Sequence, residues 1–202
     1  MKAIDPSVEL MFITPNAAQL IEAAGRTCYK SEDKITDESA EAFVKMIDKR
    51  GHHSVLEHAY ATLRFVTDRG ITHEIVRHRI ASYSQESTRY CNYTKNKFGA
   101  ELTLLPPSGM SVAERFIWDR AANQSEQNYN DMIAAGSPPQ RARGVLLTNQ
   151  KTEIVVTYNF REWLHFLKLR TAKAAHPDMQ IVAIQAGRIL AEECPAVFGA
   201  HA

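Results

Sequence analysis

The chain has 202 residues, of which 45% are apolar and 23% are charged, and its formal net charge is +1 at pH 7. This composition is that of a globular protein with a core of its own, and it excludes a disordered tail. A charge so close to zero also excludes a general nucleic-acid binder, because any bound anion must then be held by a local cluster.

The first half of the chain predicts three helices and one strand. A helix is expected over NAAQLIEAAGRTCYK, with Pro15 in its first turn. A second helix begins near Thr36 and ends at Gly51. Residues 60–67 nearly alternate and are rich in β-branched and aromatic side chains, which predicts a strand. Residues 71–79 predict a short helix.

The second half contains a long polar helix. Ser111 and Glu114 form a capping box at its start, and Gly136 marks its end. The other predicted elements are a short strand at 101–105, a helix opened by the prolines at 138–139, a buried strand at 152–158, and helices at 161–173 and 177–193. Strands are few and lack regular βαβ alternation. The pattern therefore predicts an α+β fold, a mixed or antiparallel central sheet flanked by helices, in a single domain over residues 1–202.

The cellular compartment is predicted from segments that are missing. Pro6 and neighbouring acidic residues interrupt the N-terminus, which therefore does not read as a secretory signal. No window approaches the roughly 20 apolar residues of a membrane span. Cys28, Cys91 and Cys194 are odd in number and scattered, which favours reduced thiols over disulfides. We expect a cytoplasmic protein with no membrane partner.

The densest polar segment lies between Arg77 and Tyr90 and holds three arginines, a histidine and three serines. The planar guanidinium group suits bidentate binding of phosphate. If Arg77 and Arg79 lie at a helix end, they point about 200° apart and reach two different anionic partners. A solvated basic turn is the alternative, although the segment contains little of the lysine and glutamate that such turns prefer.

Three segments resemble one known family, the flavin-dependent thymidylate synthases. The residues Arg-His-Arg at 77–79, seven intervening residues and Ser87 resemble the family signature. Upstream, GHHSVLEH at 51–58 resembles its G-H-x-S-x-x-E-H segment. Downstream, residues 159–170 resemble its N-x-R…F-x-x-x-R helix. The resemblance spans roughly residues 50 to 190 and keeps the three motifs in the family's order.

The resemblance implies roles for individual residues. Contact with FAD is implied for His52, Ser54, Arg77, His78, Arg79, Gln85, Asn159, Arg161 and His165. Contact with dUMP is implied for Glu74, Arg77, Gln85, Ser87, Arg89, Arg143 and Arg170. In the family, the arginine that matches Arg170 lies against the uracil and favours ionisation of N3, so Arg170 is the expected catalytic residue.

The resemblance also implies a reaction and its partners. NADPH reduces enzyme-bound FAD, methylenetetrahydrofolate supplies the carbon, and dUMP becomes dTMP. The family forms homotetramers whose active sites draw residues from more than one subunit. We therefore expect dUMP, folate and further copies of the chain as partners, and no nucleic acid.

Physical chemistry supports this assignment and leaves alternatives open. A nucleotide phosphate carries about two negative charges, which Arg77, Arg89 and Arg143 together offset. Arg170 follows the apolar residues LHFLKL, where a low dielectric strengthens its attraction for a uracil anion. Alternatively, Arg170 only complements a helix dipole. Ser87 reads as a hydroxyl that binds substrate rather than as a nucleophile, since no Asp–His relay accompanies it.

Metal-dependent hydrolysis and a non-catalytic binding module are the rival predictions. His53 and His58 are five residues apart, about 140° on a helix, unlike the ligand pair of a zinc hydrolase, and we expect no metal. Three positions depart from the family pattern. His53 replaces a frequent acidic residue, His165 replaces a frequent asparagine, and Pro177 breaks the helix after Arg170. These departures motivate the second rival, a flavin- or nucleotide-binding module without turnover.

Overall fold

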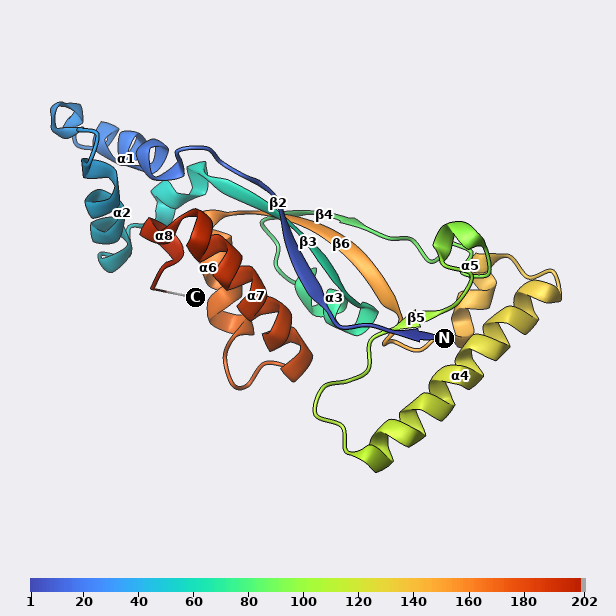
Figure 1. The fold of residues 1–202 in the computed structure, drawn as a ribbon. Helices are drawn as coiled ribbons and strands as arrows, with labels where there is room; N and C mark the ends of the chain where they lie inside the picture. The colour runs from blue at the N-terminus through green and yellow to red at the C-terminus, as the bar shows by residue number, and fades with distance from the viewer. Residues whose placement is uncertain (201–202) are drawn as a thin grey trace. The chain divides into compact units, whose positions relative to one another are not determined.

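The structure is a computed structural model that describes residues 1–200, and Figure 1 shows its fold. The chain divides into two compact units. Unit 1 consists of Met1–Ser7, Val66–Arg77 and Ser84–Ile154, and unit 2 consists of Val8–Phe65, His78–Tyr83 and Val155–Ala202. Because the segments of the two units interleave along the chain, no single cut separates them; that they form one domain stays a prediction.

Four strands are hydrogen bonded in the order β2-β3-β6-β4 and form an antiparallel sheet flanked by helices. The central strands are β3 (Tyr60–Asp68) and β6 (Lys151–Asn159). In both, every second side chain is buried, as expected for strands with one face on a core. The α+β prediction and the two predicted strands at 60–67 and 152–158 are confirmed.

The two outer strands were not predicted. They are β2 (Ser7–Ile13) and β4 (Ala81–Gln85), and neither contains a fully buried side chain. An edge strand packs on one neighbour only, so its sequence need not alternate between apolar and polar residues. The polar residues of β4 therefore gave no strand signal, although β4 belongs to the segment that we singled out as an anion-binding cluster.

The helix predicted at 71–79 is shorter and lies earlier in the chain. It is α3 (Arg69–Ile75), and the Asp68 side chain caps it by accepting the N–H of Ile71 at 2.8 Å. The Arg-His-Arg residues at 77–79 follow its C-terminus, so the helical angle expected between the two arginines does not apply. In this non-helical segment Arg77 and Arg79 are exposed, whereas His78 between them is only 5% exposed.

Unit 1 is built around the long helix α4 (Val112–Ala134). The capping box of Ser111 and Glu114 is confirmed, and Gly136 follows the helix with a φ of 89°. The buried face of α4 carries Tyr129, which packs with Tyr93 and the apolar residues near β5 (Thr103–Leu104). The other elements of unit 1 include β1 (Lys2–Ala3), which is parallel to β5, and the short helical turns η3 (Asn96–Phe98), α5 (Pro139–Ala142) and η4 (Arg143–Val145).

Unit 2 contains most of the remaining helices. They are α1 (Ala17–Thr27), η1 (Glu32–Lys34), α2 (Ser39–Lys49), η2 (His53–His58), α6 (Phe160–Arg170), α7 (Pro177–Glu193) and α8 (Pro195–Phe198). Pro15 lies before α1 rather than in its first turn, and the helix starts after Asn16, which adopts a φ of 50°. The predicted break after Arg170 is confirmed, because α6 ends there and α7 begins at Pro177.

Helix α6 packs one face on the sheet part of unit 2 and on α7, which lies beside it in Figure 1. Trp163 is fully buried, stacks on Phe65 and donates its indole N–H to the carbonyl of Ala61 at 3.0 Å. Arg161, His165 and Lys168 are exposed along the same helix. The apolar face thus fixes the rotation of α6, and with it the direction of these three polar side chains.

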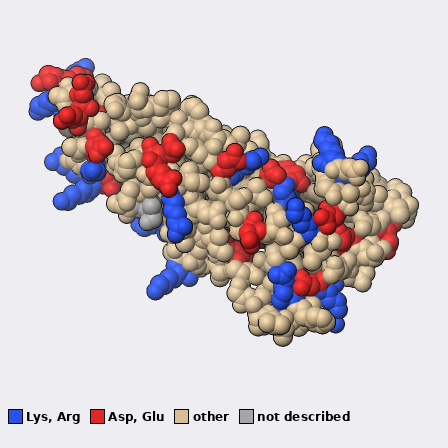
Figure 2. Space-filling view, viewed as in Figure 1, with Lys and Arg blue, Asp and Glu red and all other residues tan. Residues whose placement is uncertain are grey.

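The surface shows no area dominated by one sign of charge on the face drawn in Figure 2, where basic and acidic side chains are interspersed. This agrees with the net charge of +1. Within residues 1–200, no helix is at once long and apolar enough to cross a lipid bilayer.

Candidate active site

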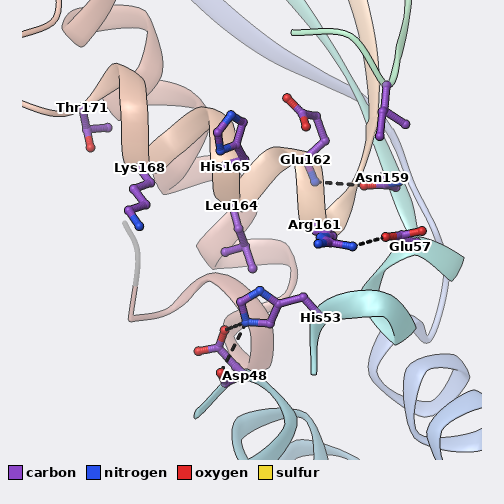
Figure 3. Close-up of a pocket in the computed structure, with 11 residues that line it drawn as sticks. Asp48, His53, Glu57, Asn159, Arg161, Glu162, Leu164, His165, Lys168 and Thr171 are labelled. Atoms are coloured by element: carbon purple, nitrogen blue, oxygen red, sulfur yellow. Dashed lines mark hydrogen bonds and ion pairs between the residues drawn. The ribbon is translucent and has the colours of Figure 1, made fainter. Parts of the chain in front are cut away.

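Unit 2 contains a cavity of about 780 Å³ beside α6 (Figure 3). Seven of its lining residues belong to α6 or adjoin it, and Figure 3 shows them along one side of the cavity. The lining residues are Asp48, His53, Glu57, Ile80, Asn159, Arg161, Glu162, Leu164, His165, Lys168 and Thr171. Three residues predicted to contact FAD, Asn159, Arg161 and His165, therefore share one cavity wall.

The start of α6 is held by contacts between polar side chains of this wall. Asn159 caps the helix, because its Oδ1 accepts the N–H of Glu162 at 2.9 Å. The Arg161 guanidinium donates to the Glu57 carboxylate at 2.5 Å and so joins α6 to η2. A carboxylate therefore balances the charge of Arg161 at the cavity edge.

His53, the first departure from the family pattern, lines the cavity from η2. Its Nε2 lies 3.2 Å from Asp48 Oδ1 and 3.3 Å from the Asp48 carbonyl (Figure 3). The ring nitrogen and the Glu57 carboxylate thus already have protein partners, which opposes the reading of these residues as a metal centre. The neighbouring His52 and Ser54 are exposed and are not among the cavity's lining residues.

The second feature of unit 2 is a buried histidine between a carboxylate and a guanidinium. His78 Nδ1 lies 2.7 Å from Glu162 Oε1, and its Nε2 lies 3.1 Å from Arg170 Nε. The rings of Tyr158, His165 and Phe166 surround it at centroid distances of 5.9, 5.6 and 5.2 Å. Burial lowers the pKa of His78, although its bond to Glu162 acts in the opposite direction. Burial therefore favours the neutral form of the His78 ring.

The backbone of His78 is fixed as well as its ring. The Tyr83 hydroxyl donates to the His78 carbonyl, and since this uses its only proton, Tyr83 Oη accepts from the Tyr158 hydroxyl at 3.0 Å. Burial raises the pKa of both phenols, so both keep their protons at neutral pH. Strand β4, which was not predicted, supplies Tyr83 and thus anchors the motif histidine.

Among the residues that the structure describes, one group has the spacing of metal ligands. It consists of His78, Glu162 and His165, whose ligand atoms lie within 4.8 Å of one another. A metal here would have to replace the direct contact between His78 Nδ1 and Glu162 Oε1 or displace the Arg170 guanidinium from His78 Nε2. His53 and His58, the pair considered as metal ligands in the sequence, are not in this group. That the protein binds no metal stays a prediction.

Unit 1 contains most of the residues predicted to bind dUMP. Ser87 opens a tight turn in which its carbonyl accepts the N–H groups of Tyr90 and Cys91 at 3.1 and 3.0 Å. Its hydroxyl accepts the N–H of Arg89 at 3.3 Å, a contact typical of a turn rather than of a nucleophile and its base. Arg143 donates to the hydroxyl of Thr88 at 3.1 Å, so the structure brings Arg143 beside this turn.

Gln85 lies just before this turn with its amide orientation determined by two threonines. Its Nε2 lies 2.9 Å from Thr72 Oγ1 and 3.3 Å from Thr152 Oγ1. The Thr72 hydroxyl donates its proton to the carbonyl of Arg69 at 2.9 Å, so it can only accept from Gln85. The NH₂ group therefore faces the threonines, and the amide carbonyl faces the other way. Glu74, half-buried on α3, is near in sequence to Thr72.

The position of the Ser87 turn depends on a charged cluster behind it. Glu86 accepts from Lys151 Nζ at 2.9 Å and from the Tyr93 hydroxyl at 2.8 Å, and Lys151 also contacts Glu153. Burial opposes the charge of Lys151, but its bonds to Glu153 and Glu86 raise the pKa of the ammonium. Lys151 thus keeps its charge, and its contact with Glu86 holds residue 86 directly before the turn.

We expect Lys151→Met to lower the free energy of unfolding by about 1–3 kcal/mol, because it leaves the partly buried Glu86 carboxylate without its cation. Chemical denaturation with urea measures the loss. The control is Lys45→Met, which removes the exposed pair between Lys45 and Glu41, a kind of contact that contributes about 0.5 kcal/mol or less. Equal stability of the two variants would contradict the role given to Lys151.

The two predicted groups are distributed unevenly between the units. Of the residues predicted to contact FAD, Arg77 and Gln85 belong to unit 1 and all others belong to unit 2. Of the residues predicted to contact dUMP, Arg170 belongs to unit 2 and all others belong to unit 1. Sequence reasoning missed Glu162, Thr72 and Lys151. The sequence indicated only one role for Glu162: an acidic residue in the first turn of a helix stabilises the positive end of the helix dipole. Nothing in the sequence indicated its contact with His78, 84 positions away.

Comparison with known proteins gives concordant results for sequence and fold. The profile of the family described as "Thymidylate synthase complementing protein" matches residues 9–196. A flavin-dependent thymidylate synthase of Geobacter sulfurreducens is 32% identical over 200 residues, which cover 95% of this chain and 84% of that protein. One of Mycobacterium avium is 36% identical over 199 residues, which cover 89% of this chain and 77% of that protein.

Among solved structures, a UMP/dUMP methylase, PolB from Streptomyces cacaoi, bound with 5-Br dUMP, has a similar fold. The TM-score is 0.84, the sequence identity is 23%, and the match covers 99% of this chain and 96% of that one. At this identity the likeness concerns the fold alone.

Proposed function

The chain belongs to the flavin-dependent thymidylate synthases, and we propose that it converts dUMP to dTMP with methylenetetrahydrofolate as carbon donor and NADPH as reductant. One observation carries the proposal. His78 of the Arg-His-Arg motif and Arg170 of the downstream helix are 92 positions apart, yet their nitrogens lie 3.1 Å from each other. Two of the family's motifs thus meet at the residue expected to activate the uracil.

The cavity beside α6 suits a flavin dinucleotide in size and in the chemistry of its wall. Its volume of about 780 Å³ lies in the range of small-molecule sites. Lys168 is a cation suited to a diphosphate, and Arg161 keeps N–H donors for it besides the one used by Glu57. Ile80 and Leu164 offer apolar contact to a ring. Asn159, Arg161 and His165 would hold the FAD. When bound, the flavin supplies the hydride that completes the methyl group.

The side chains of unit 1 would hold the substrate. Arg89 lies in the turn at Ser87 and Arg143 contacts Thr88 of the same turn, so their charges would offset that of a nucleotide phosphate. The Gln85 carbonyl, turned away from the threonines, accepts a hydrogen bond from a donor such as a ring N–H. Arg170 stabilises negative charge on the uracil ring as N3 ionises.

We also propose that the chain assembles as a homotetramer with shared active sites. Helix α4 exposes Val112, Phe116 and Ile117 on consecutive turns near its N-terminus, with exposed fractions of 91, 70 and 57%. Neighbouring large apolar side chains exposed on one helix are typical of a surface that another chain covers. Light scattering should give four times the chain mass of 22.7 kDa.

The reaction itself is tested by two measurements on the purified protein. We expect a yellow protein with the visible absorbance of an oxidised flavin, because the cavity retains FAD. We also expect release of tritium from 5-tritiated dUMP that requires both NADPH and methylenetetrahydrofolate. A colourless protein that takes up no added FAD would refute the proposal. Binding of dUMP without flavin-dependent NADPH oxidation would instead favour a non-catalytic binding module.

A further inference from the structure

The protonation of His78 follows from its two partners. An arginine Nε always carries a proton and can only donate, so His78 Nε2, 3.1 Å away, must be the acceptor. A neutral imidazole has one proton, which then lies on Nδ1 and points to Glu162 Oε1 at 2.7 Å. The order of donation is therefore from Arg170 to His78 to Glu162.

We propose that Glu162 is a positioning residue: it fixes the Nδ1–H tautomer of His78 and thereby holds the Arg170 guanidinium in place. This inference rests on the proposed function, in which Arg170 faces the uracil. In the opposite tautomer, His78 Nε2–H would face the Arg170 Nε–H, and the Nδ1 lone pair would face the Glu162 carboxylate. Both contacts would be repulsive, and Arg170 Nε would lose its hydrogen bond to His78.

The surroundings of His78 leave it little freedom other than the choice of tautomer. Three aromatic rings enclose the imidazole, and the Tyr83 hydroxyl holds its backbone carbonyl. Helix α6 carries both Glu162 and Arg170, and its apolar face fixes its rotation. Arg170 lies eight residues after Glu162 on this helix. The Glu162 carboxylate thus acts on the Arg170 guanidinium through one rigid ring, that of His78.

The inference also changes what His78 does in the proposed site. Both ring nitrogens are used within the protein, one by Glu162 and one by Arg170. His78 therefore contributes to catalysis by orienting Arg170 rather than by a ring hydrogen bond to FAD. Two simpler roles for Glu162 compete with this one: a helix N-terminal charge, which affects stability, and a contact with bound flavin, since Glu162 also lines the cavity.

Glu162→Ala and Glu162→Gln separate these roles. Alanine removes the acceptor, so we expect kcat to fall about 10- to 100-fold, as for other residues that orient a functional side chain, with a smaller change in the KM for dUMP. Glutamine keeps an acceptor oxygen and should recover most of the lost rate. Glu192→Gln on the exposed end of α7 is the charge-matched control, and its kcat should equal that of the wild type.

A spectroscopic readout makes the test independent of turnover. In the ¹⁵N spectrum of the FAD-free protein, His78 should show a protonated Nδ1 and an unprotonated Nε2 in the wild type and in Glu162→Gln, and a mixture in Glu162→Ala. His78→Asn identifies the signals. An unchanged tautomer in Glu162→Ala, or a loss of flavin affinity that accounts for the whole loss of rate, overturns the inference. A wild type without tritium release but with the expected spectrum would refute the proposed reaction and leave only the tautomer assignment of His78 standing.

Discussion

Arg170→Ala should lower kcat for methylation by about 100- to 1,000-fold, the usual effect of removing one donor that stabilises charge in a transition state. Arg170 is half-buried at the end of α6, after an apolar run, where a low dielectric strengthens its effect on a uracil anion. We expect the dissociation constant for dUMP to rise by less than about tenfold, because the phosphate contacts that we propose in unit 1 remain. Tritium release at saturating dUMP and equilibrium dialysis measure the two effects separately.

Two variants show whether the loss belongs to the guanidinium group. Arg170→Lys keeps the charge but lacks the planar fork and Nε, so it should recover only a small part of the rate. Lys173→Ala removes an exposed cation three residues beyond the helix and should leave the rate unchanged. Equal losses in kcat and in dUMP affinity for Arg170→Ala would mean that Arg170 only anchors the substrate. If Arg170→Ala lowers the free energy of unfolding but leaves the kinetics normal, Arg170 acts only as a cation that complements the dipole at the helix end.

Trp163→Ala should lower the free energy of unfolding by about 3–5 kcal/mol, in the range of large aromatic deletions from a core. Trp163 is fully buried, with ring centroids at 4.5 Å from Tyr158 and 5.6 Å from Phe166. It sets the rotation of α6, which carries the cavity residues and Arg170. We therefore expect flavin retention to be lost together with stability, as followed by circular dichroism and visible absorbance during heating.

The controls for Trp163→Ala separate packing from hydrogen bonding. Trp163→Phe keeps an aromatic ring but removes the donor to the Ala61 carbonyl, and it should cost about 1–3 kcal/mol. Tyr29→Ala removes a side chain that is 77% exposed and should have little effect. A Trp163→Ala protein as stable as the Tyr29→Ala protein would show that α6 does not depend on this contact.

The sequence by itself determined the elements whose signals are local. Strands β3 and β6 alternate because each buries one face, and the capping box at Ser111 and the proline at 177 act within one turn of a helix. The three motifs identified the family for a similar reason, since each is a short run with fixed spacing. The turn at Ser87 likewise lies in a segment whose dense polar residues are visible in the sequence.

Only the tertiary structure decided which residues meet. Strands β2 and β4 bury no side chain completely, so their place in the sheet depends on hydrogen bonds to a neighbour and not on their own pattern. His78 acquires its tautomer from Glu162 and Arg170, 84 and 92 positions away. The physical reason is that a hydrogen bond depends on the distance and direction between two atoms, which the folded backbone sets, whereas propensity and capping depend on neighbours along the chain.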